Sequence, residues 1–453
     1  MTTMKLLDFS VYVPRYRLAR SALGKGAGVR SVASYDEDAI TLGVAALRRL
    51  AVGRRRGQAL YFATSTPPYW DKSNASTVAT AAQLGAHVPC VDVAGLRSGM
   101  DALRIAVAGG GLAVSGDLRT GRPGSTEEAD GGDGAAAFLF GTALEGAPPI
   151  AEVLGQVSLC NELMDIWRRP GSRWASLAEE RFANSVHESL VKQTVDQLRA
   201  QTGWQDAPTH ALVSTLNGRL ALSLAQSLKA KSGVEMLKTH RSEVGYCGAA
   251  DPGVLLATAL GQARVGDTIL LVCAAGGVDA VLLRVLRDGV AGAQAPALSL
   301  DYLQYLTWRG LLEREPARRP DRPSVSSPAS YRNKDWKFAL VGSRCTVCGA
   351  VHLPGSRICV GCGAVDAGEP HDVADRSASL ASVSTDLVSD SPAAPAQVAV
   401  VDFDGGGRLL MEMAEVQGVD LAPGDPVQVS FRRTYEIDGT PNYFWKAVPS
   451  AQY

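Results

Sequence analysis

The sequence predicts an α/β protein with two similar halves, residues 1–150 and 151–290, followed by a four-cysteine segment and a small β-barrel. Three patterns lead to this expectation. Helical and strand-like stretches alternate throughout the first 287 residues, as in a layered α/β fold. A strand headed by glycines occurs near the end of each half. Four of the eight cysteines fall within eighteen residues, and strand and turn patterns follow them.

In the first half, apolar periodicity predicts helices over 38–50 (DAITLGVAALRRL) and 101–108 (DALRIAVA). A strand is predicted between them, over 59–64 (ALYFAT). The helical stretches are rich in alanine and glycine. Small side chains allow helices to pack closely between or against sheets, so we expect alternating layers.

The two glycine-headed strands indicate an internal duplication. They cover 131–141 (GGDGAAAFLFG) and 274–286 (AAGGVDAVLLRV), and each has an acid near its start, Asp133 or Asp279. Such a repeat is typical of an α/β half copied once along the chain. Chance similarity between two strands rich in alanine and glycine is the alternative.

The region over 300–338 is predicted to be a helix and a linker. Residues 302–314 (YLQYLTWRGLLER) are amphipathic and predict a helix. Residues 313–336 are rich in proline, arginine and serine and have no apolar periodicity. That composition is typical of a linker or of a segment lying on the surface.

The segment 339–366 carries a metal-ligand pattern. Cys345 and Cys348 form one CxxC pair and Cys359 and Cys362 form another, each followed by glycine. The glycines let backbone amides turn toward the thiolates, and the two pairs supply four sulfurs for tetrahedral Zn²⁺. Four thiolates leave no open coordination position, so the predicted zinc is structural. His352, between the pairs, is interpreted as an ordinary loop histidine.

Residues 367–453 show the pattern of a small β-barrel. One hairpin is predicted from 397–403 and 408–416, joined by the turn DGGG, and a second from 426–437 and 442–448, joined by DGT. About five strands in a region of this length fit a small barrel of the OB type.

Charge argues against nucleic-acid binding. Residues 366–453 hold fourteen acidic and five basic side chains, a balance of −9, whereas binding to phosphates needs the opposite sign. The run Tyr443, Phe444, Trp445 offers rings for base stacking, but its position in a strand favours packing in a core or against a partner.

Nothing in the sequence predicts export or membrane insertion. The first twenty residues pass directly into strand-like alternation, without the apolar core and cleavage site of a signal peptide. No uncharged apolar run approaches the ~20 residues that a membrane span needs. With a net charge of −1, the chain is expected to be soluble and cytoplasmic.

Six segments of the first 287 residues carry a family resemblance: VYVPRYRL, SYDEDAITLGVAALRRL, ATSTPPYWDKSNAS, DVAGLRSGMDALR, RTGRPGSTEEADGGDGAAAFLFG and VGYCGAADPGVLLATAL. Through them this region resembles the thiolase superfamily, in the branch of hydroxymethylglutaryl-CoA synthases and ketoacyl synthase III. The resemblance implies a duplicated, layered α-β-α-β-α fold and an acyl-CoA thioester as substrate.

A second resemblance covers residues 300–453. Its matching segments are DWKFALVGSRCTVCGAVHLPGSRICVGCGA, VVDFDGGGR and FRRTYEIDGTPNYFWKA. These resemble the zinc-ribbon/OB-fold family that accompanies acyl-CoA enzymes. The resemblance implies that the barrel contacts a protein or a bound thioester.

The first resemblance implies catalytic positions that this chain does not fill. In the family a cysteine begins a buried helix, whose dipole favours the thiolate. By the DVA and SG that frame it, this position holds Arg97, which cannot be acylated. The family histidine is replaced by Ser214 or Thr215, the asparagine by Tyr246 and the synthase acid by Ser65. The thiolase-like site is therefore predicted to be degenerate.

Other residues are candidates for chemistry. Cys247 lies in the loop before a predicted helix, with His240 a few residues upstream, so a nucleophile and base pair is conceivable. Cys273 ends the strand TILLVC, roughly where thiolases keep a second cysteine that works as acid and base. Alternatively both cysteines are small residues of the core. The remaining candidates are Cys90 and Cys160.

Arg97 allows two interpretations. Its guanidinium would bind a carboxylate or phosphate in a former acyl pocket, or it would pair with an acid such as Asp133 and fill the site. The basic residues of 330–337 (SYRNKDWK) similarly allow contact with CoA phosphates or a solvated linker surface.

Two functions follow as expectations. In the first, the chain is a subunit of an acyl-CoA complex that forms or cleaves a carbon–carbon bond. Its zinc/OB module would dock a catalytic thiolase partner and shape the partner's CoA channel. In the second, the chain is itself an acyltransferase or hydroxymethylglutaryl-CoA-synthase-like enzyme using non-standard residues. A regulatory or nucleic-acid-binding protein is disfavoured by charge. The resemblance implies at least a homodimer.

Overall fold

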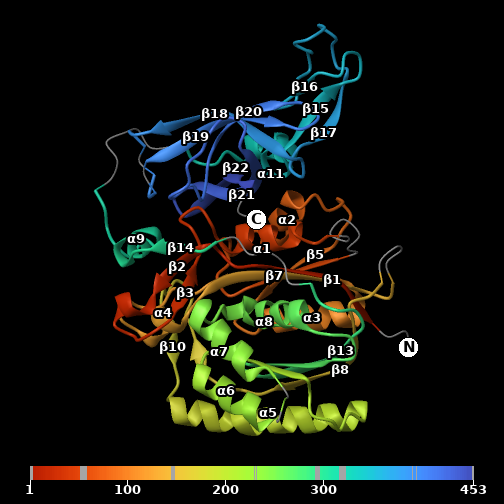
Figure 1. The fold of residues 1–453 in the computed structure, drawn as a ribbon, viewed down its shortest axis with the longest axis vertical. Coiled ribbons are helices and arrows are strands. Elements are labelled where there is room, and N and C mark those ends of the chain that lie inside the picture. Colours follow the sequence, from red (N-terminus) through yellow and green to blue (C-terminus); the bar gives the residue numbers. More distant parts are fainter. Residues whose placement is uncertain are drawn as a thin grey trace.

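The computed structural model describes residues 4–51, 59–143, 148–228, 230, 232–290, 296–315, 323–389, 391–393 and 395–450. Figure 1 shows an α/β body in the lower part of the molecule and a β-rich C-terminal part above it. No helix among the described residues has the length and apolar character needed to cross a lipid bilayer.

The body contains a mixed sheet of nine strands within the described residues, made of two half-sheets that meet at β1 and β8. This seam pairs Lys5 with Glu152 and Leu6 with Ala151. Across the sheet the order is β11 (His210–Ser214), β12 (Thr268–Ala274), β13 (Gly277–Val285), β8 (Ala151–Cys160), β1 (Lys5–Tyr12), β7 (Asp133–Gly141), β6 (Gly111–Leu118), β4 (Leu60–Thr64) and β5 (Cys90–Ala94).

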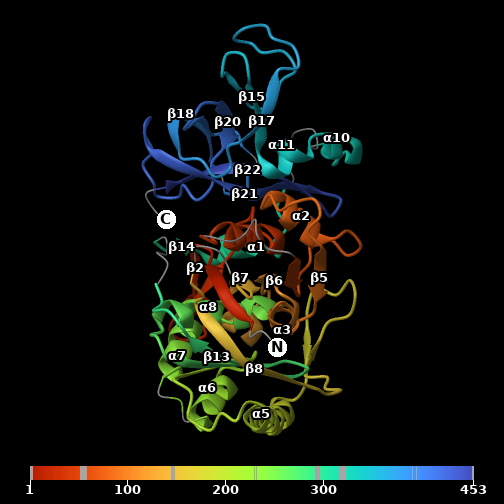
Figure 2. The ribbon, with the colours of Figure 1, turned by 90° about the vertical axis from the view of Figure 1, so that its right-hand side faces the viewer.

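Helices lie on both sides of each half-sheet, so helices and sheets alternate through the body (Figure 2). In the middle, α8 packs against β7 and β1 of one half-sheet and against β11 and β12 of the other. The helices are α1 (Ala39–Arg48), α2 (Asn74–Ala81), α3 (Ser98–Gly109), α4 (Thr126–Asp130), α5 (Glu180–Thr202), α6 (Gly218–Ser227), α7 (Val234–Glu243) and α8 (Asp251–Gln262).

The predicted elements of the body are present. The helix expected over 38–50 is α1, which begins after Asp38 because that side chain accepts from the Thr41 amide in a capping box. The expected strand over 59–64 is β4, and the helix over 101–108 lies within α3. The two glycine-headed segments form β7 and β13. Since β7 lies beside β1 and β13 beside β8, they hold equivalent places on the two sides of the seam.

The region before the ribbon differs from the prediction. The helix expected over 302–314 is α9 (Tyr302–Trp308), which ends earlier, and Gly310 has a φ of +58° that favours glycine. The segment expected to be irregular holds α10 (Ser327–Arg332) and α11 (Lys334–Ala339). These helices have six residues each, too few to show an apolar period in the sequence. Residues 316–322 of the segment lie outside the described residues.

Short strands complete the body and form the ribbon. In the body, β2 (Tyr16–Ala19), β3 (Val29–Val32) and β14 (Leu298–Leu300) form one small sheet, and β9 (Ile166–Trp167) and β10 (Ser176–Leu177) form another. The ribbon sheet contains β16 (Val351–His352), β15 (Val341–Cys345) and β17 (Gly368–Asp372). Because β17 pairs with β15, the ribbon extends past the boundary predicted at residue 366.

The C-terminal sheet has the order β20 (Arg408–Glu412), β19 (Ala396–Phe403), β18 (Ala378–Asp386), β21 (Pro426–Ile437) and β22 (Thr440–Pro449). The two predicted hairpins are β19–β20 and β21–β22, and β20 ends at Glu412, before the predicted residue 416. The outer strands meet, because Met413 after β20 bridges Ala447 of β22. The sheet therefore curls back on itself.

A continuous apolar core joins this sheet to the body. One cluster of buried side chains contains Val44 and Leu47 of α1 together with Phe431 and Trp445 of the C-terminal sheet. The run of aromatic residues is thus core, as its alternation predicted, with Tyr443 and Trp445 each 1 % exposed.

A buried ionic network fastens the same interface. Arg432 on β21 lies 2.7 Å from Glu37 Oε1 and 3.5 Å from Asp36 Oδ1, both in the body. It also pairs with Glu415 of the C-terminal part. Lys446 Nζ lies 3.1 Å from Asp36 Oδ2. Removing one member would strand a buried charge, so the network fixes how the barrel sits on the body.

Candidate functional site

The start of α3 is where the resemblance places the nucleophile, and the structure gives Arg97 an internal partner there. Arg97 Nε lies 2.9 Å from Asp279 Oδ2 on β13. Its Nη1 donates to the Gly276 carbonyl at 3.4 Å. Arg104, seven residues after Arg97 and within α3, lies 3.1 Å from the other oxygen of Asp279. Two cations of α3 thus share one carboxylate that is 0 % exposed.

The proposed pairing of Arg97 with Asp133 is wrong, although the interpretation of an internal acid partner is correct. Asp133 accepts from the amides of Ala33 at 2.7 Å and Arg119 at 2.9 Å. It also pairs with Arg309. Arg97 pairs instead with Asp279, the equivalent acid of the second half. The reason is that the beginning of β13, rather than that of β7, lies beside the start of α3.

A cavity of about 520 Å³ opens beside this helix start. Its walls bring together Leu96, Thr215, Tyr246 and Ala275, from loops of both halves. Thr215 is one of the two residues, with Ser214, that the resemblance sets against the family histidine, and Tyr246 is the one that it sets against the asparagine. Burial raises the pKa of Tyr246 well above its ordinary value, so its phenol stays protonated. The volume lies within the range of small-molecule sites.

The same cavity contains a histidine and an acid that the sequence analysis did not select. His187 on α5 is 4 % exposed, and its Nε2 lies 3.2 Å from Asp165 Oδ2. Asp165 also accepts from the Gly276 amide at 2.8 Å. Burial acts to raise the pKa of Asp165, but hydrogen bonds from His187 and from the Gly276 and Ile166 amides lower it overall. The carboxylate is therefore charged and orients the imidazole, an arrangement typical of a general base.

No local motif marks this pair. His187 lies in a helix of otherwise ordinary amphipathic pattern, and Asp165 lies in the loop before β9. The two meet because α5 packs across β8 and β13. The one sequence feature that could have indicated His187 is its position on the apolar face of α5. A histidine at such a position is more often a packed core residue than a catalytic one.

The structure brings His240 and Cys247 together, but in the interior. His240 Nε2 lies 2.9 Å from Asp251 Oδ1, and the Cys247 amide donates to the same oxygen at 3.0 Å. Ser214 donates to the other oxygen at 2.7 Å. Cys247 is 0 % exposed, and burial raises the pKa of its thiol well above the ordinary value. A neutral, enclosed thiol is a poor nucleophile.

The other cysteines of the body have no access to the cavity either. Cys273 is 2 % exposed, and burial, together with Asp279, raises the pKa of its thiol well above the ordinary value. Cys90 lies on β5 and Cys160 at the exposed end of β8. None of the four body cysteines is among the residues that line the cavity.

Ser65, which stands for the synthase acid, is bound to an acid instead. Its hydroxyl donates to Asp117 Oδ2 at 2.6 Å, and Asp117 also accepts from Thr66 at 2.6 Å and from the Ala249 amide at 2.7 Å. Asp117 is 0 % exposed. With its oxygens occupied in this way, the carboxylate joins β6 to the segment before α8.

The ribbon holds the four predicted ligands close together. The sulfurs of Cys345, Cys348, Cys359 and Cys362 all lie within 4.8 Å of one another. Two separations are 3.8 Å (Cys345 to Cys362) and 3.4 Å (Cys348 to Cys359), close to the roughly 3.8 Å edge of a tetrahedron with Zn–S bonds of about 2.3 Å. His352 lies on β16 rather than in a loop. The residues present therefore fit a metal ion.

Of the basic residues of 330–337, Lys337 contacts the barrel, while Arg332 and Lys334 are exposed. Lys337 Nζ donates to Asn442 Oδ1 at 2.7 Å, and the ring of Trp336 lies 5.6 Å from that of Phe444. None of the residues in this stretch lines the cavity.

Comparison with curated proteins finds hydroxymethylglutaryl-CoA synthases, while no family model matches the chain. The synthase of Pyrobaculum neutrophilum is 27 % identical over 356 residues, covering 69 % of this chain and 99 % of that protein. The synthase of Pyrococcus furiosus is 27 % identical over 294 residues, covering 60 % and 83 %. That of Thermococcus sibiricus is 32 % identical over 186 residues, covering 36 % and 52 %.

Solved structures of the same kind share the fold. A hydroxymethylglutaryl-CoA synthase complexed with CoA matches with a TM-score of 0.55 at 14 % identity, over 63 % of this chain and 83 % of that one. The 3-oxoacyl-(acyl carrier protein) synthase III of Pseudomonas aeruginosa matches with a TM-score of 0.51 at 20 % identity, over 64 % and 100 %. The chain thus resembles hydroxymethylglutaryl-CoA synthases in sequence, and about two thirds of it shares the fold of these solved synthases.

Proposed function

We propose that this chain binds an acyl-CoA thioester in the cavity beside α3 and works as a non-acylating component of a system that forms or cleaves a carbon–carbon bond. In this proposal the acyl group is carried by a cysteine of a thiolase-family partner. The similarity to hydroxymethylglutaryl-CoA synthases supports the substrate class.

The observation that carries the proposal is the ion pair between Arg97 and Asp279. At the position of the nucleophile there is a cation, and a buried carboxylate neutralises it at 2.9 Å. A side chain held in this way neither accepts an acyl group nor leaves room for one. The cavity beside it nevertheless stays open, at about 520 Å³. A retained pocket without a nucleophile favours binding and presentation over acyl transfer.

The C-terminal part supplies the second half of the proposal. The strand order, with β18 central and β20 meeting β22, supports an OB-type barrel. The four thiolates would hold a structural Zn²⁺, which would fix the shape of the ribbon. The ribbon exposes apolar side chains, among them Val347 at 68 % and Val360 at 87 %. We assign this ribbon tip to the thiolase-family partner, since the barrel itself is fastened to its own body.

A homodimer is also part of the proposal. β5 is an outer strand of the body sheet, and Val91 on it is 44 % exposed. An outer strand with exposed apolar residues is a ready surface for pairing with a second copy.

The test combines ligand binding with intact-protein mass spectrometry. The purified chain is titrated with acetyl-CoA by calorimetry and then incubated with it before mass measurement. We expect binding without a covalent adduct. Leu222→Trp places a bulkier side chain in the cavity wall and should weaken acetyl-CoA binding. Leu228→Trp changes a residue at the end of the same helix but outside the cavity, and it should leave binding unchanged. A stable adduct on the lone chain would sink the proposal.

The partner is tested separately by co-purification with a thiolase-family protein that has its cysteine. Val347→Glu with Val360→Glu should abolish the association without changing acetyl-CoA binding by the chain alone. Retained association with both substitutions would remove the ribbon tip from the proposal.

A second function is favoured by the His187 and Asp165 pair. With Asp165 facing Nε2, Nδ1 of His187 is the nitrogen available to a substrate. A neutral imidazole would take a proton from the carbon next to the thioester carbonyl, leaving its electron pair as an enolate on the thioester oxygen. The Tyr246 phenol lines the same cavity and would donate a hydrogen bond to that oxygen. Such chemistry needs no acyl-enzyme.

This second function predicts solvent exchange at the α-carbon of bound acetyl-CoA. In heavy water the chain should catalyse incorporation of deuterium into the acetyl group of acetyl-CoA. The His187→Gln variant should lower the rate of this exchange by about 10² or more and keep acetyl-CoA binding. The Asp165→Asn variant should lower the exchange rate and shift its pH profile. No exchange above the uncatalysed rate would eliminate this candidate.

A further inference from the structure

A second pocket, of about 370 Å³, lies where the body, α9 and the C-terminal barrel meet. It is lined by five arginines, which we call the arginine pocket: Arg119, Arg168, Arg173, Arg309 and Arg433. They come from four separate segments of the chain. Arg119 follows β6, Arg168 and Arg173 lie between β9 and β10, Arg309 ends α9, and Arg433 lies on β21. The pocket exists only where these elements are assembled, and the proposed function does not use it.

Three of the arginines are neutralised within the pocket wall. Arg119 pairs with Glu127 and Arg309 pairs with Asp133. Arg433 Nη1 lies 3.0 Å from Glu436 Oε2. The charges of these three arginines are therefore already used in ion pairs within the protein.

Arg168 and Arg173 are different, because neither has a carboxylate partner among the described residues. Each is held by a backbone carbonyl: Arg168 donates to Ser65, and Arg173 donates to Arg309 and, at 3.0 Å, to Gly310. A guanidinium has five N–H donors, so each keeps donors for a ligand. The carbonyls orient these two cations without neutralising them.

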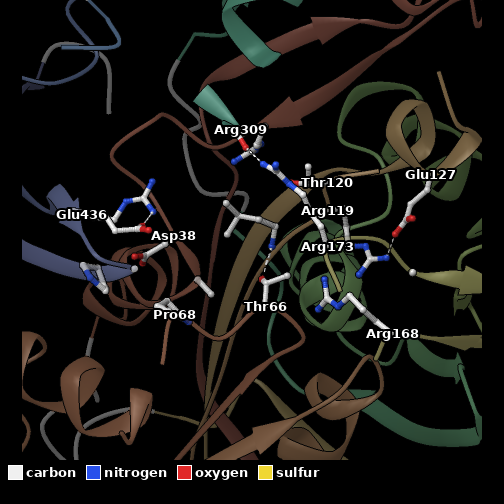
Figure 3. A pocket seen from close by; sticks show the side chains of 16 residues that line it. Asp38, Thr66, Pro68, Arg119, Thr120, Glu127, Arg168, Arg173, Arg309 and Glu436 are labelled. Atoms are coloured by element: carbon white, nitrogen blue, oxygen red, sulfur yellow. Dashed lines mark hydrogen bonds and ion pairs between the residues drawn. The ribbon is translucent and has the colours of Figure 1, made fainter. Parts of the chain in front are cut away.

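The charges of the lining are distributed unevenly. Figure 3 shows Arg119, Arg168 and Arg173 together on one side of the pocket, with Asp38 and Glu436 on the other. Five arginines face three lining acids, Asp38, Glu127 and Glu436, and Asp133 behind Arg309 is a fourth, so the group carries a net charge of +1.

From this arrangement we infer that the arginine pocket binds a phosphate group in its dianionic form, as a phosphate monoester or a diphosphate, between Arg168 and Arg173. The planar forks of the two guanidinium groups match phosphate oxygens in a bidentate manner. The negative charge of the ligand would offset the two guanidinium groups that have no carboxylate partner among the described residues. The volume leaves room for the organic group that a phosphate monoester carries.

The ligand would touch three parts of the fold at once. Arg168 and Arg173 belong to the body, Arg309 to the segment that leads to the ribbon, and Arg433 to the barrel. A phosphate bound here would therefore add a bridge between body and barrel. Its binding would raise the melting temperature with the logarithm of the ligand concentration once that concentration exceeds Kd.

The test uses the full chain and titrates pyrophosphate and inorganic phosphate by calorimetry, with melting temperature as a second readout. Arg168→Gln with Arg173→Gln should weaken binding by about tenfold or more, since hydrogen bonds to charged groups are lost. Both side chains are exposed, so the fold should persist. Arg122→Gln is the matched control: Arg122 lies over the Trp174 ring at 6.0 Å, as Arg173 does at 5.5 Å, but does not line the pocket.

The source of the phosphate is separated by comparing CoA with dephospho-CoA. If the double variant loses affinity for CoA and not for dephospho-CoA, the pocket takes the 3′-phosphate of CoA. If only pyrophosphate binding is lost, the pocket takes a separate phosphorylated molecule. Either result supports the inference. It is overturned if pyrophosphate and phosphate do not bind the unsubstituted chain at millimolar concentration, if the double variant binds as well as the Arg122→Gln control, or if citrate binds more tightly than pyrophosphate.

Discussion

Arg97 and Asp279 form an ion pair of 2.9 Å across the two halves of the body, between the start of α3 and the start of β13. Arg104 shares the same carboxylate at 3.1 Å. A cation at a helix N-terminus is unfavourable for the helix dipole, and the buried acid offsets this cost. The position that resembles a catalytic cysteine therefore has a structural role in joining the halves.

Replacement of Arg97 should accordingly lower stability. In Arg97→Leu the buried Asp279 retains only Arg104, and we expect the free energy of unfolding in urea to fall by about 1–3 kcal/mol. Arg97→Leu combined with Asp279→Leu should recover part of this loss, because both charges are then absent. An unchanged urea midpoint for the single variant would contradict the role assigned to the pair.

Arg97→Cys should give the chain an acylatable group. The thiol would lie at the N-terminus of α3, where the helix dipole lowers the pKa of a cysteine. After incubation with acetyl-CoA, intact-mass spectrometry should show one acetyl group on this variant and none on the unsubstituted chain. Arg104→Cys, on the same helix but away from its start, is the control. Absence of the adduct from Arg97→Cys would mean that the cavity does not deliver the thioester to this position.

Zinc should stabilise the ribbon and little else. We expect about one zinc per chain by elemental analysis, and Cys359→Ser or chelation should remove it. Proteolysis should then cut within 341–372 while the body stays intact, because the ribbon lies at the far end of the molecule (Figure 1). Cys160→Ser, which changes an exposed cysteine outside the cluster, should retain zinc. A full zinc content in Cys359→Ser would refute the four-thiolate site.

Folding stability should depend on pH through Glu37. Burial raises the pKa of Glu37; the Arg432 guanidinium opposes this, Glu415 and Asp36 reinforce it, and the pKa is about 7 against an ordinary value of 4.5. Between these values the folded chain keeps a proton that the unfolded chain has lost, so this contribution to stability falls as pH rises from about 4.5 to 7 and is constant above.

The measurement is the unfolding free energy of the unsubstituted chain minus that of Glu37→Gln at several pH values. The difference should decrease by at most about 3 kcal/mol across the window. Glu412→Gln, which removes a half-exposed carboxylate beside Lys446 in the same network, serves as the matched control. A difference that rises with pH would show that the sign is wrong.

Much of the fold could be predicted because its signals are local. The capping box at Asp38, the apolar run of β4 and the hairpin turns of the barrel each lie within or next to the element that they define. The CxxC pairs likewise fix their own geometry. The sequence did not predict α10 and α11 because helices shorter than two turns show no apolar period. Of the two, α11 packs on β22 of the barrel.

The candidate site was less predictable because its partners come from distant segments. Two similar strands, β7 and β13, offer equivalent acids, and only the packing of the halves decides that Asp279 rather than Asp133 meets Arg97. His187 and Asp165 lie on elements without a motif and meet through the packing of α5. Cys247 and His240 lie close together, as their spacing suggested. Their burial could not be read from the sequence, because it depends on distant segments that pack over the loop before α8.

The ionic network beneath the barrel limits how the chain can be divided for experiments. A fragment that begins after α11 would retain Arg432 and Lys446 but leave Asp36 and Glu37 on the other piece. It would also uncover the aromatic side chains that pack on α1. Such a fragment would expose formerly buried charged and aromatic side chains to solvent and be prone to aggregate. Work on the ribbon and barrel is therefore best done by substitution within the full-length chain.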